Sequence, residues 1–183
     1  MQPMAQNITS MNGPTKEMEM EIMKGNVIHG GNKCLRWQFG CAIIYTDNNE
    51  NKRVIKEQKE NKKVDGVIAS IIALNSYVQN RIDGYVEMVQ QKMNAYWKRC
   101  NFTHSPPDSI TVDYGKKYAR VVHQNNVQRS VHTFVNMING DILKSGGWKA
   151  PAPNGVRGNI FENDFGASVV NEYGASYLKW NTN

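Results

Sequence analysis

The sequence lacks the features that define several common classes of protein. It has no apolar run close to the roughly 18 residues that a membrane-spanning helix needs. Its first residues lack the basic-then-apolar profile of a secretory signal. Its three cysteines are widely scattered, so they form neither a disulfide framework nor a zinc-binding signature. The sequence therefore predicts a cytoplasmic protein, in a reducing compartment, with no membrane partner.

Several catalytic motifs are also absent. The chain contains no phosphate-binding G-x-x-x-x-G-K-[ST], no G-x-S-x-G of the serine hydrolases and no H-E-x-x-H of the zinc proteases. These absences exclude a P-loop ATPase and argue against a stand-alone enzyme of these kinds. Whether the chain has any enzymatic activity stays open at this point.

Positive charge is present and unevenly distributed. The 183 residues include 22 Lys and Arg against 16 Asp and Glu, a net charge of +6. The window from Tyr114 to Arg157 holds seven basic residues and a single acid, Asp141. Charge concentrated in one segment favours an anionic partner such as DNA. A solvated face of a β-sheet explains the same charges equally well.

Apolar patterning divides the chain near residue 80 into two small α+β units. Residues 1–13 are polar and without period, which predicts a disordered N-terminus before a first unit at 14–79. Within this unit we expect a helix over 15–24, a turn-rich connection over 26–37, a buried strand over 41–46, a charged mobile loop over 47–63 and an apolar helix over 64–77.

The second unit, residues 80–183, is expected to be one helix followed by an antiparallel sheet. Apolar residues spaced three and four apart from Ile82 to Trp97 mark one stripe of an amphipathic helix. Asn139-Gly140 is a two-residue hairpin signal. After Trp148 the chain is rich in Gly and Pro and is expected to form a loop. The predicted strands are 109–115, 117–124, 128–137 and 141–144.

Two motifs occur in order within the first unit. HGGNKCLRW at 29–37 precedes the expected strand, and KKVDGVIASIIAL at 62–74 forms the apolar helix. Together they resemble the C-terminal end of the nuclease domain of the large terminase subunit of tailed bacteriophages. Lys33 and Cys34 depart from the first motif, and Leu35 and Trp37 are expected in the core. The matching residues are Asn32, Leu35, Arg36, Trp37, Lys63, Asp65, Gly66 and Ala69.

The resemblance implies a fragment of an RNase H-like nuclease domain and a role in viral DNA packaging. In that family a cluster of acids holds the divalent metal ions that cut DNA, and Asp65 matches the last of these acids. Asp65 would then be a catalytic residue and a metal ligand, while Glu57 and Glu60 match no family ligand. One carboxylate cannot hold a two-metal site. Mg²⁺ or Mn²⁺ would therefore bind only if another chain, an upstream terminase polypeptide, completes the site.

Two of the matching residues have other possible roles. Asp65 stands where an N-cap of the apolar helix would stand. Arg36 could contact a DNA phosphate or hold a neighbouring carboxylate. The sequence leaves both alternatives open.

The second unit has a resemblance of its own. Its recognisable pieces are KYARVV, RSVHTFV, NGDILK and WKAPAPNGVRGNI, beginning at Lys117, Arg129, Asn139 and Trp148. They resemble a family of small, uncharacterised bacteriophage proteins over about residues 85–180. This resemblance implies that the unit comes from a phage, but it implies no activity.

Basic and aromatic residues alternate in the second unit. Single-stranded nucleic acid needs cations for its phosphates and ring faces for its bases, and a Gly-rich basic loop can surround a phosphate with backbone N–H groups. Tyr114, Tyr118, Phe134 and Trp148 are the candidate rings, although the same rings could form the core. The candidate nucleic-acid-binding cations of the whole chain are Arg36, Lys117, Arg120, Arg129, Lys144, Lys149 and Arg157.

Two histidines could also meet in the second unit. His123 and His132 lie on adjacent predicted strands, and they would approach each other if the chain reverses near Asn125-Asn126. Two histidines can begin a metal site or an acid–base pair. No third ligand is found at a suitable spacing, although His104, Cys100 and Asp113 are available.

Three functions follow from these patterns. The first is a terminase nuclease fragment that serves DNA packaging and is inactive alone. The second is a non-catalytic nucleic-acid-binding accessory protein that acts through the basic sheet. The third is a structural or interaction protein of the phage.

Overall fold

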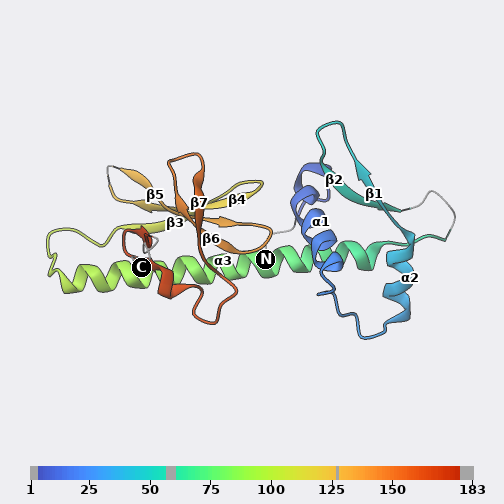
Figure 1. Cartoon of the computed structure of the whole chain (residues 1–183), viewed down its shortest axis with the longest axis horizontal. Coiled ribbons are helices and arrows are strands. Elements are labelled where there is room, and N and C mark those ends of the chain that lie inside the picture. Colours follow the sequence, from blue (N-terminus) through green and yellow to red (C-terminus); the bar gives the residue numbers. More distant parts are fainter. Residues whose placement is uncertain (1–3, 57–60, 127, 178–183) are drawn as a thin grey trace, which may run out of the picture. The chain divides into compact units, whose positions relative to one another are not determined.

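The computed structural model describes residues 4–56, 61–126 and 128–177. Within these ranges the chain is a mixture of helices and antiparallel sheets, so the expected α+β class is confirmed (Figure 1). The chain divides into two compact units, unit 1 (Met1–Tyr77) and unit 2 (Val78–Asn183). No helix in the described part of the chain is both long and apolar enough to cross a membrane.

Unit 1 contains two helices, a β-hairpin and the beginning of a third helix. The strands β1 and β2 pair antiparallel, with Ile44 opposite Val54. Its elements are α1 (Ile8–Met23), α2 (Lys33–Cys41), β1 (Ala42–Thr46), β2 (Lys52–Lys56) and the start of α3 (Asp65–Arg99). Its core consists of Met11, Met18, Cys41, Val54, Val64, Val67 and Ile71.

The helix α1 begins earlier than the sequence predicts. It starts at Ile8, and the side chain of Asn7 caps it by accepting a hydrogen bond from the Ser10 N–H at 2.8 Å. Met11 is buried in the core of unit 1. The prediction of disorder is therefore wrong for residues 8–13, because one buried methionine anchors a segment that is otherwise polar.

Two other elements of unit 1 were expected to be irregular. The turn-rich connection contains the start of α2, which is capped by Asn32 through a hydrogen bond from the Leu35 N–H at 2.9 Å. The charged loop contains β2, in which Val54 is buried. Both segments are polar overall, so their few apolar residues do not form the clear periodicity that would predict a helix or a strand. Glu57 and Glu60 of that loop lie outside the described residues.

The two helices predicted on either side of residue 80 are a single helix. The helix α3 runs from Asp65 to Arg99. Its buried apolar residues are spaced three, four or seven apart, as expected for one stripe of a helix. These residues are Val67, Ile71, Val78, Ile82, Tyr85, Val89 and Met93. The division between the units therefore falls within a helix rather than in a linker.

Unit 2 is a five-stranded antiparallel sheet that packs on α3 (Figure 1). One sheet face contributes Ile110, Ala119, Val121, Val135 and Ile142 to a core shared with the helix, and Ile160, which follows β7, joins this core. The strands, in spatial order, are β3 (Ser109–Tyr114), β4 (Tyr118–Gln124), β5 (Arg129–Asn136), β6 (Asp141–Ser145) and β7 (Pro151–Asn159). The first four agree with the predicted strands to within one residue at each end.

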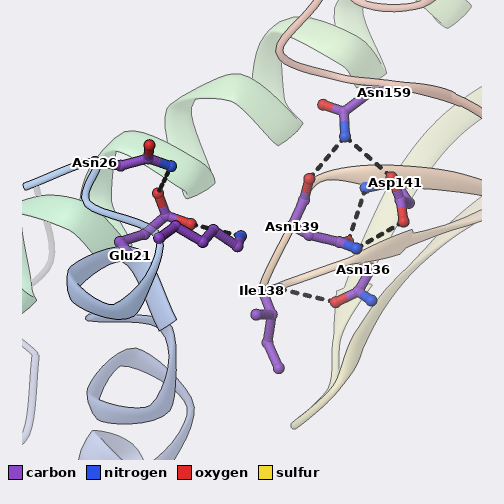
Figure 2. Close-up of polar contacts among 8 residues, drawn as sticks. Glu21, Asn26, Asn136, Ile138, Asn139, Asp141 and Asn159 are labelled. Atoms are coloured by element: carbon purple, nitrogen blue, oxygen red, sulfur yellow. Dashed lines mark hydrogen bonds and ion pairs between the residues drawn. The ribbon is translucent and has the colours of Figure 1, made fainter. Parts of the chain in front are cut away.

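The turn between β5 and β6 lies at the predicted position but is longer than two residues. The Gly140 N–H donates to the Asn136 carbonyl at 2.9 Å, and Gly140 has a φ of 72°. Asn159 Nδ2 donates to the Asn139 carbonyl at 2.7 Å and to Asp141 Oδ1 at 3.1 Å (Figure 2). The side-chain amide of Asn159, which lies outside the turn, thus holds the turn in place. The local sequence predicts where the turn lies but not this contact.

The fifth strand of this sheet, β7, was expected to be a loop. Within the described residues it is an edge strand whose pairing with β6 is irregular, and prolines are tolerated at such positions. After β7 come a short helical turn, η1 (Ala167–Val169), and two small strands, β8 (Val170–Asn171) and β9 (Gly174–Ala175).

Candidate functional site

Asp65 is the first residue of α3 and is exposed. The carbonyl of Val64 accepts the first intrahelical bond, from the Ile68 N–H at 3.0 Å, so Val64 occupies the N-cap position. The N-cap role considered for Asp65 is therefore wrong. Its carboxylate nevertheless lies in the first turn, where the helix dipole favours negative charge.

The two terminase-like motifs meet at this helix end. Gln38 of α2 accepts a hydrogen bond from the Gly66 N–H through its Oε1. A Cβ at Gly66 would lie 2.9 Å from this oxygen and 3.2 Å from Leu35 Cδ1. The glycine of the second motif therefore allows α2 to approach closely and hold the turn that carries Asp65.

The residues around Asp65 do not make a metal site by themselves. Over residues 4–56, 61–126 and 128–177, no group of three or more His, Cys, Asp or Glu could hold a metal ion. Cleavage with two metal ions needs several converging carboxylates. The donor set in these ranges therefore does not fit Mg²⁺ or Mn²⁺ without further ligands.

Arg36 and Trp37 both lie on the surface of α2. The ring of Trp37 is 45% exposed, so its expected place in the core is wrong. Arg36 is exposed and has no ion pair with any carboxylate that the structure describes. Of its two predicted roles, contact with a phosphate is thus compatible with its position.

The sheet face of unit 2 that points away from α3 carries a compact charged group. Asp113 lies opposite Arg120 in the pairing of β3 with β4. Asp113 Oδ2 is 3.1 Å from Arg120 Nη2, and its Oδ1 is 3.1 Å from Arg129 Nη2. One carboxylate is therefore shared by two arginines, which leaves an excess of one positive charge.

Trp148 completes this group. Its carbonyl accepts a hydrogen bond from Arg120 Nη1 at 2.8 Å. The centroid of its ring lies 4.2 Å from Arg120 Cζ and 5.4 Å from Arg129 Cζ, within the range of cation–π contacts. The tryptophan is 40% exposed. We call Asp113, Arg120, Arg129 and Trp148 the arginine cluster.

Arg157 does not belong to the arginine cluster. Its guanidinium donates to three backbone carbonyls, those of Asn154, Val156 and Ser176, at 2.6, 2.9 and 2.7 Å. These bonds attach the C-terminal segment to β7. The contacts of Arg157 therefore indicate a structural role.

The three candidate lysines of unit 2 differ from the two arginines in their contacts. Lys117 Nζ is 5.2 Å from the centroid of the Tyr118 ring, and Lys144 Nζ is 3.1 Å from that of Tyr177. Lys149 is exposed. The structure thus brings Arg120 and Arg129 together at one carboxylate.

The remaining aromatic candidates are held by other contacts. Phe134 is buried, as the core interpretation requires. The hydroxyl of Tyr114 donates to Asp83 Oδ1 at 3.0 Å, and burial together with this carboxylate raises the pKa of Tyr114. Trp148 is therefore the predicted ring best placed to stack on a base beside the arginines.

The two histidines have separate partners. Val121 pairs with Thr133 and Val122 with Val131, which makes His132 the extra residue of a β-bulge. His132 Nε2 lies 2.8 Å from the Asn171 carbonyl, and burial lowers its pKa to about 4. His123 Nε2 instead lies 2.7 Å from Asp108 Oδ2. No three-ligand metal group includes either histidine in the part of the chain described.

Sequence reasoning considered Asp113 only as an available metal ligand and missed that it organises the arginine cluster. The alternation of SITVDY does place Asp113 on the face opposite the apolar Ile110 and Val112. Its pairing with Arg120 could have been deduced by folding β3 back onto β4 through a short turn. The link to Arg129 could not, because it joins β3 to β5, which are not neighbours in the sheet.

Family models match both parts of the chain. Residues 1–81 match the model for the endonuclease domain of the terminase large subunit. Residues 47–177, more than half of the chain, match that of a family of unknown function, DUF7717. The chain therefore belongs to the DUF7717 family and also contains a terminase nuclease segment, so both predicted resemblances are confirmed. The two models overlap over residues 47–81, which include β2 and the first turns of α3.

One similar protein is much longer than the matching segment. Protein YmfN of Escherichia coli (strain K12) is 39% identical over 71 residues, which are 38% of this chain and 15% of YmfN. The match therefore covers a small part of that relative. No solved structure matches the chain.

Proposed function

We propose that this chain serves the packaging of bacteriophage DNA as the C-terminal part of a terminase nuclease domain. The observation that carries the proposal is the match of residues 1–81 to the terminase endonuclease domain. In this proposal unit 1 retains part of an RNase H-like domain, is inactive alone and acts in the cytoplasm of an infected cell. DNA and an upstream terminase polypeptide are its partners.

Asp65 would supply one carboxylate to a metal site that the upstream polypeptide completes. Its exposed position supports this role, because a ligand from another chain can reach it. Asp65 lies at the N-terminal end of α3, and Gln38 fixes the turn on which it stands. Arg36, exposed on the same helix as Gln38, would contact a DNA phosphate.

The test uses a terminase large-subunit polypeptide truncated before its own K-x-D-G motif. Mn²⁺ binding is measured by calorimetry, and cleavage of double-stranded DNA is measured in parallel. We expect neither with the present chain alone and both with the mixture. Asp65→Asn should abolish cleavage and weaken Mn²⁺ binding at least about tenfold, since one of few metal-bound oxygens loses its charge.

Glu50→Gln is the matched control, because it removes one exposed carboxylate from the hairpin turn of the same unit. It should leave both measurements unchanged. Equal Mn²⁺ binding and cleavage by the Asp65→Asn and unmodified chains would contradict the proposed role of Asp65.

A second candidate function is the binding of single-stranded nucleic acid by the arginine cluster. The observation that favours it is the pair of arginines that share Asp113 beneath an exposed tryptophan. A phosphate could replace Asp113 as their partner, since arginine binds carboxylate and phosphate oxygens in the same geometry. A base would then stack on Trp148.

This function is tested by the anisotropy of a labelled single-stranded oligonucleotide at several salt concentrations. Arg120→Gln together with Arg129→Gln should weaken binding at least about tenfold and reduce its salt dependence, since two phosphate contacts are lost. Lys98→Gln, an exposed cation at the end of α3, is the control. Unchanged affinity in the double variant would exclude the cluster as a binding site and favour the structural role.

A further inference from the structure

One edge of the strand β1 is not paired by any strand that the structure describes. Within the described residues β1 pairs only with β2, in a two-stranded sheet. The outer edge of β2 is covered by α1, since Asn12 Oδ1 accepts the Lys52 N–H at 2.9 Å. Figure 1 shows α1 beside β2, with β1 on the other side of the hairpin. Alternate N–H and C=O groups of β1 are therefore available for another strand.

The composition of β1 is unusual for an exposed edge. Ile43, Ile44 and Tyr45 are all exposed, and the strand carries no charged residue. Natural edge strands are normally protected by charge, by proline or by a covering segment. A two-stranded hairpin is also only marginally stable by itself. These features are typical of a strand that is covered in the functional assembly.

An apolar pocket of about 270 Å³ lies under the same strand. Ile22 and Ile44, which are 45% and 41% exposed, line its open side. A further lining residue, Thr15, is buried, and its hydroxyl has no hydrogen-bond partner in the described chain. Ordinary cores leave few voids larger than a water molecule, about 30 Å³. The pocket therefore has room for side chains from outside unit 1.

We propose that β1 and this pocket bind a β-strand from the upstream part of a terminase nuclease domain, supplied by a separate polypeptide. This inference rests on the proposed function of unit 1. The strand pairs with the main chain of β1 and places an apolar side chain beside Ile44, as in other cases of strand addition.

Two observations favour this occupant over a second copy of the chain. The segment similar to YmfN is only 15% of that protein, so in this relative it is a small part of a longer chain. In addition, β2 carries Lys52, Arg53 and Lys56 and no acid. Lys52 pairs with Glu19 at 2.7 Å, and a segment that supplies metal-binding carboxylates complements the charge of Arg53 and Lys56, whereas the β1 strand of a second copy carries no charge.

The experiment measures binding of the truncated terminase polypeptide to the immobilised full chain. Ile44→Lys and Ile22→Lys each place a charge at the rim of the pocket. We expect each to weaken binding at least about tenfold. Ile28→Lys is the matched control, because Ile28 belongs to the same unit and is 91% exposed. It should bind like the unmodified chain, and circular dichroism shows whether each variant is folded.

The outcomes separate this inference from the proposed function. Binding that both rim variants weaken, without cleavage of DNA, supports the docking of the strand and contradicts the nuclease role. Cleavage by a single chain that joins the two polypeptides, without binding between the separate ones, supports the nuclease role and overturns the docking. Self-association in sedimentation velocity that Ile44→Lys abolishes, without terminase binding, also overturns it in favour of a second copy.

Discussion

Arg120 and Trp148 are connected twice, although one lies in a strand and the other in an irregular segment. The guanidinium donates to the carbonyl of Trp148 at 2.8 Å and lies 4.2 Å from the centroid of the same residue's ring. The sheet therefore orients the segment that follows β6, and the indole is held over the arginines before any ligand arrives.

Replacing the ring of Trp148 should weaken nucleic-acid binding while changing the stability of the fold only little. Trp148→Ala should weaken single-stranded DNA binding roughly 5- to 150-fold, since stacking of a base on an aromatic ring contributes about 1–3 kcal/mol. The free energy of unfolding in urea should change by no more than about 1 kcal/mol, because the ring is 40% exposed. Trp148→Phe should recover part of the affinity. Equal affinity of all three chains would rule out stacking on Trp148.

The buried pair of Tyr85 and Thr133 should behave as a coupled unit. Their hydroxyl oxygens are 2.8 Å apart, and both residues are inaccessible to solvent. Tyr85→Phe and Thr133→Val should each destabilise the protein by about 1–3 kcal/mol, because each leaves a buried hydroxyl without this partner. The double variant should lower the free energy of unfolding by less than the sum of the two single variants. Additive free energies in urea denaturation would show that the bond contributes nothing.

His132 should make the protein less stable in acid. Burial lowers its pKa to about 4 in the folded chain, below the ordinary value of 6.5. Its contribution is therefore fully present above pH 6.5 and is lost as the pH falls toward 4, because the unfolded chain binds the proton first. The loss is on the order of 3 kcal/mol. Unfolding free energies of the unmodified chain and His132→Gln should converge over this range, and parallel profiles would contradict the assignment.

Glu17 of unit 1 should make the protein less stable at high pH, in contrast to His132. It lies on α1, and burial, reinforced by the nearby Glu21, raises its pKa from 4.5 to about 8. Glu21 is itself engaged, by Asn26 Nδ2 at 2.7 Å and Lys24 Nζ at 2.8 Å (Figure 2). The contribution of neutral Glu17 is fully present below pH 4.5 and is lost as the pH rises through 8. Glu17→Gln should therefore stabilise the protein more at pH 9 than at pH 5 in thermal denaturation. An equal shift at both pH values would exclude ionisation of Glu17.

Much of unit 2 could be predicted because its patterns are strong. Alternating apolar residues located β3 to β6, and a spacing of three and four located the stripe of α3. The strand β7 escaped prediction because Pro151, Pro153 and Gly155 resemble a loop. Only an edge position next to β6 makes such a segment a strand. The helix α2 and the strand β2 were missed for a related reason, since each has few buried residues.

The candidate sites were less predictable than the elements. Charge alone selected Arg120, Arg129 and Arg157 as equivalent cations. In the structure, Arg157 donates to backbone carbonyls, whereas Arg120 and Arg129 both pair with Asp113. Such a division depends on which acceptors lie within a few ångströms, and periodicity carries no information on distance.

The sequence by itself determined the two family segments, the concentration of positive charge and most of the strands, because these depend on residue types and their spacing along the chain. Tertiary structure decided that Asp65 stands without a three-ligand group among the described residues, that Trp148 lies over two arginines and that β1 has an open edge above a pocket. These properties depend on strand register and on packing between residues far apart in the chain, which local patterns do not specify.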